Sequence, residues 1–493
     1  MTPVTTMAGR TVAVFGLGGS GLATAEALRA GGAVVTVWDD GATARDKAQA
    51  AGFEAVDPLI HGLGGYGALV LSPGVPLTHP TPHPVVAVAK AAGVEIIGDI
   101  ELFCRERARI CPDAPFVAIT GTNGKSTTTA LIAHLLRHAG RDVAMGGNIG
   151  TAILSLPVPS HSCVHVIECS SFQIDLTPSL APGIGILTNL TPDHLDRHGT
   201  MAAYAAIKER LVAASALALI GQDDAWCRAI AERCRAAGRI VIPFAMQGDG
   251  AGAGLDAGAR LDAGAGLALR GTDVVARDAQ GHETLFPLAG LATLRGTHNA
   301  QNAAAAIACV TALGVPPQTI MEGLKTFPGL AHRMEVLGQI GPVLIVNDSK
   351  ATNADSAAVA LASYPRDIYW IIGGVAKEGG IASLAPYFDR LAHVYLIGKA
   401  AALFQSQLPD TVRVTHSGTL DQAFADAVAD ARADRHAKEP VVLLSPACAS
   451  YDQFPNFEVR GARMRALAEA EPDFVPFGST PHSQQEASHG IAH

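Results

Sequence analysis

Short apolar runs alternate with longer Ala-rich stretches of helical periodicity along most of the chain. The run Thr11–Phe15 leads into a glycine-rich turn, a helical stretch that reaches about Ala30, and a second apolar run, Val34–Trp38. A strand, a helix and a second strand in this order predict a βαβ unit. Because the same alternation recurs further along the chain, we predict an α/β fold with parallel, doubly wound sheets.

Proline-rich breaks divide this pattern into three blocks. Cys111–Pro115 interrupts it before the predicted strand Phe116–Thr120, and Pro328-Gly329 interrupts it before the predicted strand Val343–Val346. A length of 493 residues also favours about three domains at roughly 150 residues per domain. We therefore predict domains at residues 1–112, 113–328 and 329–478.

Two segments fall outside the alternation. The segment 248–267 consists of Gly, Ala, Asp, Leu and a single Arg, and we predict a loop or short β insertion there. The tail, residues 479–493, is polar and lacks a periodic apolar face, so we predict that it is disordered.

Composition narrows the class of protein. Apolar residues make up 48% of the chain and charged residues 16%, which predicts a soluble globular protein. The net charge of −9 argues against broad affinity for nucleic acid or anionic lipid. The chain shows no signal-peptide pattern, no apolar run of about 20 residues and no C-x-x-C pair. We expect a cytoplasmic protein without membrane insertion.

The strongest chemical signal is the segment Thr120-Gly-Thr-Asn-Gly-Lys-Ser-Thr127, which follows an apolar strand and precedes a helix. Backbone N–H groups in such a turn cradle phosphates at a helix N-terminus. Lys125 would neutralise the β- and γ-phosphates and Ser126 would reach Mg²⁺. Ile119 stands where the strict P-loop pattern has glycine. The alternative interpretation is a glycine-rich turn with a solvated lysine.

A second glycine-rich turn, Gly16-Leu-Gly-Gly-Ser-Gly21, lies in the first block and is followed by Asp39. Taken alone, this pattern is typical of NAD-binding proteins, but the same turn binds any diphosphate against a helix N-terminus. Ser72 follows another strand of this block and could face the same ligand. An oxidoreductase and a purely structural turn therefore stay open as alternatives for this segment. A further alternative for the whole chain is a non-catalytic, nucleotide-gated binding protein, which would retain Lys125 but need neither Glu168 nor Lys208.

Two residues of the middle block, Glu168 and His194, are candidates for a metal site. Glu168 ends the apolar run that begins at Val164, and strand-end carboxylates near a P-loop commonly approach Mg²⁺. A predicted strand at Gly185–Leu190 would deliver His194 to the same edge, as a metal ligand or as an ordinary loop or core group. Lys208, on a helix that begins near Met201, is by itself interpreted as a surface lysine.

The third block has three polar strand ends. The segments 347–353, 373–377 and 445–454 each follow an apolar run, and in an open parallel sheet they gather at the ligand-binding edge. Their side chains suit a small dicarboxylate: Lys350, Thr352, Lys377 and Ser450. The alternative is three capped helix starts. Cys448, without a His/Asp constellation, is interpreted as a packing residue.

In their order along the chain, these motifs resemble the Mur ligase family, from Val12 to about Glu471. The resemblance rests on Gly-Thr-Asn-Gly-Lys-Ser-Thr at 121, Glu-Cys-Ser-Ser-Phe-Gln at 168, Asn-Leu-Thr-Pro-Asp-His-Leu-Asp at 189, His-Asn-x-x-Asn at 298, His-Arg at 332, Asn-Asp-Ser-Lys-Ala-Thr-Asn at 347 and Leu-Ser-Pro-Ala-Cys-Ala-Ser-x-Asp-Gln-Phe at 444. The last two motifs are most similar to the members that add D-glutamate.

The resemblance implies a Rossmann-like N-terminal domain that holds a UDP-linked substrate, a central P-loop ATPase domain, and a Rossmann-like C-terminal domain that holds the amino acid. It implies a ligase of cytoplasmic peptidoglycan precursor synthesis that adds D-glutamate to UDP-N-acetylmuramoyl-L-alanine. The substrate carboxylate would attack the γ-phosphate of ATP to give an acyl phosphate. We expect a monomer.

The resemblance also implies a role for individual residues. Those matching the UDP contacts are Gly18, Gly19, Ser20, Asp39 and Ser72. Those matching the ATP contacts are Gly121, Thr122, Asn123, Gly124, Lys125, Ser126, Thr127, Asn299, Asn302, Arg333 and Asp348. Those matching the D-glutamate pocket are Lys350, Thr352, Lys377, Ser450 and Phe457. The implied catalytic residues are Lys125, Asn148, His194 and Lys208. Two Mg²⁺ ions are implied, one on Ser126 and Glu168 and one on His194 and Lys208, the latter as a CO₂-derived carbamate.

Overall fold

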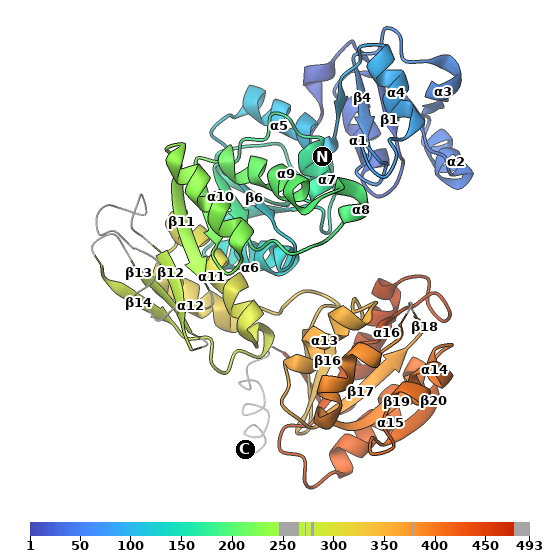
Figure 1. Ribbon diagram of the computed structural model, residues 1–493, viewed down its shortest axis with the longest axis vertical. Helices are drawn as coiled ribbons and strands as arrows, with labels where there is room; N and C mark the ends of the chain where they lie inside the picture. The colour runs from blue at the N-terminus through green and yellow to red at the C-terminus, as the bar shows by residue number, and fades with distance from the viewer. Residues whose placement is uncertain (246–265, 272, 278–280, 377–378, 478–493) are drawn as a thin grey trace, which may run out of the picture. The chain divides into compact units, whose positions relative to one another are not determined.

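The computed structural model of the protein describes residues 1–245, 266–271, 273–277, 281–376 and 379–477 (Figure 1). The chain forms two compact units. The first unit comprises Met1–Ala289 and Thr297–Lys325, and the second comprises Gly290–Gly296 and Thr326–His493. Most strands of the main sheets pair in parallel and alternate with helices, which confirms the predicted α/β class.

The N-terminal part of the first unit contains a five-stranded parallel sheet in the order β3-β2-β1-β4-β5. Its strands are β1 (Thr11–Phe15), β2 (Val34–Trp38), β3 (Glu54–Ala55), β4 (Ala68–Leu71) and β5 (Ile96–Ile97). Its helices are η1 (Thr5–Met7), α1 (Gly21–Ala30), α2 (Ala42–Ala50), α3 (Pro58–His61), α4 (Pro84–Ala91) and α5 (Asp99–Ile110). The predicted βαβ unit is confirmed, and its strand order is that of a nucleotide-binding fold.

The first unit also contains, within its described residues, a nine-stranded sheet in the order β14-β13-β12-β11-β10-β9-β6-β8-β7. The pairings from β7 through β12 are parallel, whereas β12, β13 and β14 pair antiparallel. The strands are β6 (Phe116–Thr120), β7 (Asp142–Gly147), β8 (Cys163–Glu168), β9 (Ile184–Leu187), β10 (Leu217–Gly221), β11 (Ile240–Ala245), β12 (Gly266–Arg270), β13 (Asp273–Arg277) and β14 (Glu283–Phe286).

Helices cover this second sheet, and Figure 1 shows α9 and α10 close to its strands. Apolar residues of α9 and α10 pack with alternate strand residues such as Ala118 and Ile220, whereas α6 packs against α11. The helices are α6 (Lys125–His138), η2 (Ile153–Ser155), α7 (Ser171–Asp175), α8 (Leu195–His198), α9 (Met201–Ala213), α10 (Ala225–Ala236), α11 (Thr297–Ala312) and α12 (Pro317–Thr326).

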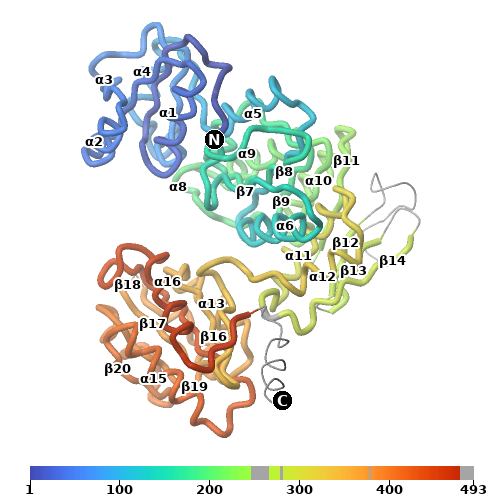
Figure 2. The backbone as a smooth tube through the Cα atoms, turned by 180° about the vertical axis from the view of Figure 1, so that it is seen from behind, coloured from blue at the N-terminus to red at the C-terminus, as the bar shows by residue number. Residues whose placement is uncertain are grey.

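The second unit contains a seven-stranded sheet in the order β20-β19-β17-β21-β16-β15-β23 and a small ribbon of β18 and β22, counted over its described residues. Figure 2 labels β16, β17, β19 and β20 of this sheet. The strands are β15 (Glu335–Ile340), β16 (Val343–Asn347), β17 (Ile368–Gly373), β18 (Val375–Ala376), β19 (Leu391–Ile397), β20 (Val414–Gly418), β21 (Val441–Leu444), β22 (Cys448–Ala449) and β23 (Phe474–Pro476). The helices are η3 (Ala292–Leu294), α13 (Ala354–Ala362), η4 (Ala382–Arg390), α14 (Ala401–Gln407), α15 (Leu420–Ala433) and α16 (Phe457–Glu469).

Strand β17 shows why this sheet is buried on both faces. Trp370 and Ile372 belong to an apolar cluster with residues of α13, η4 and α14, whereas Tyr369 and Ile371 belong to a second cluster with residues of α15 and α16. Successive side chains of a strand point to opposite faces, so helices on both sides require a continuous apolar run.

Three sequence predictions need correction or lie outside the described residues. The strand predicted at Gly185–Leu190 ends earlier, at Leu187, because Thr188 and Asn189 form side-chain hydrogen bonds with the Gly-rich turn. The predicted insertion 248–267 lies outside the described residues except for its last two, which begin β12. The predicted tail, 479–493, lies wholly outside them. Across the described residues, no helix combines the length and apolar character needed to cross a membrane.

Candidate functional site

The carboxyl edge of the N-terminal sheet carries the predicted diphosphate turn. Gly16 has φ +92°, and a Cβ there would lie 2.5 Å from Cβ of Ser72, so both the conformation and the packing require glycine. Asp39 accepts hydrogen bonds from the backbone N–H groups of Leu17 at 2.6 Å and Gly41 at 2.8 Å. The structure therefore brings together this turn, Asp39 and Ser72, with Ser20 at the start of α1 and Gly18 and Gly19 between.

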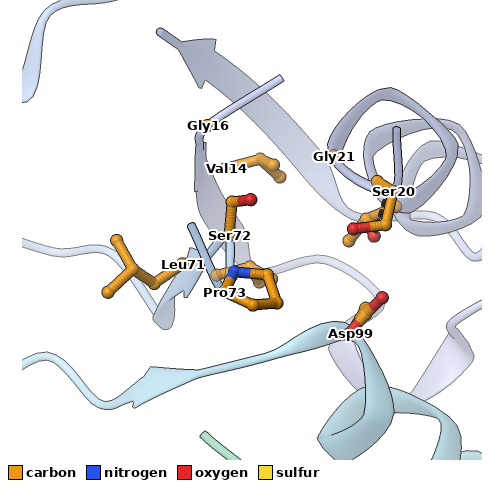
Figure 3. A pocket seen from close by; sticks show the side chains of 10 residues that line it. Val14, Gly16, Ser20, Gly21, Leu71, Ser72, Pro73 and Asp99 are labelled. Atoms are coloured by element: carbon orange, nitrogen blue, oxygen red, sulfur yellow. Dashed lines mark hydrogen bonds between the residues drawn. The ribbon is translucent and has the colours of Figure 1, made fainter. Parts of the chain in front are cut away.

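A small cavity of about 10 Å³ lies beside this turn. Ser20, Ser72 and Asp99 are among the residues that line it (Figure 3). Sequence reasoning missed Asp99, which begins α5 and is 5% exposed. Burial raises the pKa of its carboxyl group, although the backbone N–H of Ile100 donates a hydrogen bond to it at 2.9 Å. The only signal for Asp99 was an acidic residue at a helix start, which is common in proteins.

The Gly-rich turn after β6 is held by its neighbours. Parallel register pairs Thr120 with Leu187 on β9, so the turn meets the residues that follow β9. Thr188 donates from Oγ1 to the carbonyl oxygen of Asn123 at 2.7 Å, and the N–H of Asn123 donates to Oδ1 of Asn189 at 2.9 Å. The predicted turn, residues 121–127, thus leads into the N-terminus of α6, where backbone N–H groups can bind phosphate.

Two glycines of this turn are fixed by sterics. Gly121 and Gly124 have φ +144° and +81°. A Cβ on Gly121 would lie 1.9 Å from Oγ1 of Thr188, and one on Gly124 would lie 2.1 Å from Oδ1 of Asn302. Lys125 donates from Nζ to the carbonyl oxygens of Gly121 at 3.0 Å and Thr122 at 2.8 Å, so its ammonium group folds back over the turn.

Glu168 and Asn148 come together at the next strand. Ile119 pairs with Glu168 on β8, so this carboxylate stands beside the start of the turn. Oε1 of Glu168 accepts a hydrogen bond from Nδ2 of Asn148 at 2.8 Å. Oε2 is buried and has no hydrogen-bond partner among the described residues, and Ser126 is buried as well. A buried, unpaired carboxylate oxygen fits a Mg²⁺ ligand.

In the part of the chain that the structure describes, no three His, Cys, Asp or Glu residues cluster as metal ligands. This is compatible with Mg²⁺, which is usually held by one or two carboxylates together with water and substrate phosphates. The residues present therefore fit Mg²⁺ held partly by substrate.

His194 and Lys208 differ in their surroundings. The His194 side chain is 51% exposed, its backbone has φ 51°, and its Nε2 lies 3.5 Å from Oδ2 of Asp193. Lys208 is 2% exposed, so the interpretation as a surface lysine was wrong. Its Nζ donates to Oγ1 of Thr120 at 3.0 Å and to the carbonyl oxygen of Gly121 at 2.7 Å. Burial and then the nearby Lys125 lower the pKa of Lys208 well below its usual range.

A Ser–His pair next to these residues was not predicted. Oγ of Ser171 lies 2.8 Å from Nε2 of His198, and the Phe172 ring stacks on the His198 ring. Burial, followed by the charge of His194, lowers the pKa of His198 to about 4. Ser171 lies inside the motif that begins at Glu168, and His198 lies two residues after the motif that ends at Asp196. Nothing in the spacing of these motifs indicated that the two side chains would meet.

Helix α11 presents Asn299 and Asn302 on one face, because residues three apart on a helix are neighbours. Nδ2 of Asn302 donates to Oδ1 of Asn299 at 3.3 Å, and Oγ1 of Thr128 donates to Oδ1 of Asn302 at 3.4 Å. The missed residue here is Gln301, whose Nε2 donates to Oδ2 of Asp223 at 2.7 Å. Both asparagines are buried against α6 and the Gly-rich turn.

In the second unit, Arg333 lies between two residues of unusual backbone conformation. His332 has φ 61° and Met334 has φ 44°, a region that costs non-glycine residues free energy. The turn is held by Asp348, whose Oδ1 accepts from the N–H of Met334 at 3.1 Å and whose Oδ2 accepts from Oγ of Ser445 at 2.8 Å. Burial raises the pKa of Asp348 to about 7.

The three polar strand ends do meet at one edge, as predicted. Leu444 on β21 pairs with Asn347 on β16 and with Ile371 on β17, and β18 pairs with β22 beyond that edge.

Of the predicted amino-acid contacts, Nζ of Lys350 lies 5.5 Å from the centre of the Phe457 ring. The N–H of Thr352 donates to the carbonyl oxygen of Lys350 at 2.8 Å. Lys377 lies outside the described residues.

Three buried residues lie at this edge: Ser450, Cys448 and Arg460. Oγ of Ser450 is buried and has no hydrogen-bond partner within the described ranges. Cys448 is buried, and burial raises the pKa of its thiol to about 12, which agrees with a packing residue rather than a nucleophile. Sequence reasoning missed Arg460, on α16, which is 1% exposed. Its side chain donates hydrogen bonds to the carbonyl oxygens of Ser349, which follows β16, and of Cys448, which follows β21.

Comparison with known proteins adds family similarity to this geometry. Residues 119–310 match the family described as "Mur ligase middle domain", and residues 332–448 match "Mur ligase, glutamate ligase domain". A UDP-N-acetylmuramoylalanine--D-glutamate ligase of Brucella abortus (strain 2308) is 56% identical over 477 residues, which cover 97% of this chain and 99% of that relative. A ligase of the same name from Rhizobium meliloti (strain 1021) is 55% identical over 462 residues, covering 94% and 96% of the two chains.

Solved structures share the fold at lower identity. A UDP-N-acetylmuramate-alanine ligase from Thermotoga maritima is 18% identical, with a TM-score of 0.55 over 93% of this chain and 99% of that chain. A UDP-N-acetylmuramoyl-L-alanyl-D-glutamate--2,6-diaminopimelate ligase, also 18% identical, has a TM-score of 0.53 over 82% of this chain and 93% of that chain. At this level of identity the similarity concerns the fold alone.

Proposed function

This chain belongs to the Mur ligase family, and we propose that it is the ligase that joins D-glutamate to UDP-N-acetylmuramoyl-L-alanine with conversion of ATP to ADP and phosphate. The observation that carries the proposal is the Gly-rich turn with Lys125 at the start of α6, next to the buried, unpaired carboxylate oxygen of Glu168. The relatives that share more than half of this sequence are named as ligases of this reaction. The product would be a peptidoglycan precursor.

The reaction would have two steps. The carboxylate of the nucleotide substrate forms a bond to the γ-phosphorus of ATP, and ADP leaves. The amine of D-glutamate then forms a bond to the acyl carbon, phosphate is expelled, and the amine loses a proton. Backbone N–H groups at the start of α6 and the ammonium group of Lys125 would bind the transferring phosphoryl group and stabilise its charge. Asn148 would hold Glu168 through its 2.8 Å hydrogen bond.

Metal ions would assist the first step. When bound, Mg²⁺ offsets the repulsion between the ATP phosphates and the attacking carboxylate. We propose that Ser126 and Glu168 hold one ion and that His194 and a carbamylated Lys208 hold a second. The unpaired Oε2 of Glu168 supports the first site.

A carbamate on Lys208 would form when the Nζ lone pair attacks the carbon of CO₂ and the nitrogen loses a proton. The reaction requires a neutral amine. Burial and the adjacent Lys125 lower the pKa of Lys208, which supports a neutral amine at neutral pH. The carbamate would supply the oxygen ligand that Mg²⁺ prefers.

Each substrate would have its own part of the chain. We propose that residues 1–112 bind UDP, residues 113–328 bind ATP and residues 329–478 bind D-glutamate, in a cytoplasmic monomer. In the first part, the Gly16–Gly21 turn, Asp39 and Ser72 would contact the uridine nucleotide. In the last, Lys350, Thr352, Lys377, Ser450 and Phe457 would contact the amino acid, and Arg333 and Asp348 would contact ATP.

Isotope transfer tests the acyl-phosphate route. UDP-N-acetylmuramoyl-L-alanine labelled with ¹⁸O in its alanyl carboxylate should give up one labelled oxygen to the released phosphate for each amide formed. Mass spectrometry of the phosphate and of the nucleotide product would measure this. An amide product with unlabelled phosphate would contradict the proposed first step.

A further inference from the structure

Arg460 is a buried cation that the proposed function does not use. It lies on α16, close in sequence to Phe457, and is 1% exposed. Nε donates to Oγ of Ser349 at 3.0 Å, and one terminal nitrogen, Nη2, donates to the carbonyl oxygens of Ser349 at 2.8 Å and Cys448 at 3.1 Å. These three acceptors are uncharged, so no ion pair among the described residues neutralises the buried guanidinium group, and the carboxylates of Asp452 and Asp348 favour its charge only at longer range.

The contacts of Arg460 join separate segments of the second unit. Ser349 lies between Asp348 and Lys350 in the loop after β16, and Cys448 lies two residues before Ser450 in the loop after β21. Oγ of Ser349 also donates to the carbonyl oxygen of Phe457 at 2.8 Å. Arg460 therefore fixes, through hydrogen bonds, the three segments that carry Lys350, Ser450 and Phe457.

The arrangement leaves polar groups unsatisfied inside the protein. Nη1 of Arg460 and Oγ of Ser450 are both buried, and neither has a hydrogen-bond partner in the part of the chain that the structure describes. Burial also lowers the pKa of Arg460 to about 10. Unsatisfied buried groups destabilise a fold unless something else engages them, and their presence at one edge points to a ligand.

We propose that Arg460 is a positioning residue for the incoming amino acid: it sets the separation of the Lys350 and Ser450 loops, and its charge adds to that of Lys350 in selecting a dicarboxylate. The proposal rests on the proposed function, because it takes D-glutamate as the ligand of these loops. It requires that Arg460 affects the binding of the amino acid and leaves the binding of ATP and of the nucleotide substrate unchanged.

The test compares Arg460→Met, Arg460→Lys and the matched control Arg463→Met in steady-state assays of the full chain. Arg463 lies on the same helix, but its side chain is 47% exposed and pairs with Asp421. For Arg460→Met we expect the KM for D-glutamate to rise by about tenfold to a hundredfold, as for loss of a charge-assisted hydrogen bond, with KM for ATP within about twofold of the unsubstituted protein. Arg460→Lys should recover part of the loss, and Arg463→Met should be unchanged.

Equal changes in the KM values for all three substrates, or an unchanged KM for D-glutamate in folded Arg460→Met, would overturn the proposal. If Arg460→Met does not fold, Ser349→Ala serves instead, because it removes one acceptor of Arg460 and should raise the KM for D-glutamate alone. An unsubstituted protein without D-glutamate-dependent turnover would instead contradict the proposed function, so the two failures are distinguishable.

Discussion

Lys125 and Lys208 both donate to the carbonyl oxygen of Gly121, at 3.0 and 2.7 Å. Two ammonium groups on one oxygen repel each other, and burial disfavours the charge of Lys208 in particular. Burial and the charge of Lys125 both favour the neutral form of Lys208. The same pair can therefore supply a cation for phosphate and a neutral amine for CO₂.

The first prediction concerns Lys208. Lys208→Ala should lose most of the ligase activity, because the variant lacks the oxygen ligand that the carbamate would provide, and added formate or acetate should restore part of it. Phosphate release measures the activity, and the exposed Lys90→Ala is the control. Full activity of Lys208→Ala without added carboxylate would exclude the carbamate.

The second prediction concerns Lys125. Lys125→Ala should reduce kcat by roughly a hundredfold or more, as when a preorganised donor to a transferring group is removed. Stopped-time assays of phosphate release at saturating substrate would measure the change. A variant that is folded, as circular dichroism would show, and that retains its full rate would contradict the role of this lysine.

The third prediction uses the raised pKa of Asp348. A carboxyl group whose pKa is about 7 in the folded protein and near 4 in the unfolded chain binds more protons when folded between these values, so its contribution to stability falls as pH rises through 7. Asp348→Asn should therefore gain stability relative to the unsubstituted protein between pH 5 and pH 8. Urea unfolding at both values would measure this, with the exposed Asp410→Asn as control. An equal difference at the two pH values would contradict it.

At the scale of the element, helix α11 supports the Gly-rich turn that begins α6. Oδ1 of Asn302 occupies the space that a side chain on Gly124 would need. Helices α6 and α11 pack together within the first unit, although more than a hundred residues separate them in the sequence. We therefore expect ATP binding at the turn to depend on α11, whether or not Asn302 contacts ATP.

The fourth prediction isolates this steric effect. Gly124→Ala should lower both thermal stability and ATP affinity more than Gly140→Ala does. Both glycines have positive φ, +81° and +73°, but a Cβ on Gly140 meets nothing within 4 Å. Both substitutions therefore introduce a similar backbone strain of about 1–2 kcal/mol, and the difference between their effects measures the clash of the new Cβ with Asn302. Equal effects of the two substitutions on ATP affinity would show that α11 does not constrain the turn.

The sequence predicted the bounds of a strand correctly where glycine or aspartate directly follows the apolar run. Thr11–Phe15, Val34–Trp38 and Phe116–Thr120 were predicted with their observed bounds. It failed where polar side chains extend an apolar run, as at Thr188, because their hydrogen bonds to a distant turn cannot be seen in a local pattern.

Some candidate site residues could likewise be predicted from local sequence, and others could not. Glu168 and Lys125 carried local signals, whereas the burial of Lys208 and the contacts of Asp99, His198 and Arg460 depend on which segments pack together. The spacing of residue types predicts which side chains are neighbours within one helix or strand. It cannot predict the hydrogen bond of Lys208 to Gly121, or those of Arg460 to Ser349 and Cys448, because these join segments that are distant in the sequence.

At the scale of the whole molecule, the proposed reaction divides its substrates between the two units. The phosphate-binding turn belongs to the first unit and the Lys350 and Ser450 loops to the second. The amine must come within bonding distance of the acyl carbon, and water must be kept from the acyl phosphate. The net charge of −9 opposes the approach of anionic substrates, so local Lys, Arg and Mg²⁺ charge would have to overcome it.

The fifth prediction follows from this division. A hinge near Pro328 should allow the units to close, because Pro328-Gly329 lies at the junction and Gly329 has φ +81°. Small-angle X-ray scattering should show a smaller radius of gyration with a non-hydrolysable ATP analogue, Mg²⁺ and UDP-N-acetylmuramoyl-L-alanine than without ligands. Superimposable profiles would argue against closure.

Release of phosphate from ATP by the purified protein tests the proposed ligase reaction most directly. We expect rapid release only when ATP, UDP-N-acetylmuramoyl-L-alanine and D-glutamate are present together, with one amide formed for each phosphate. Release that is equally fast when D-glutamate is omitted or replaced by L-glutamate, or the absence of release with all three substrates, would contradict it.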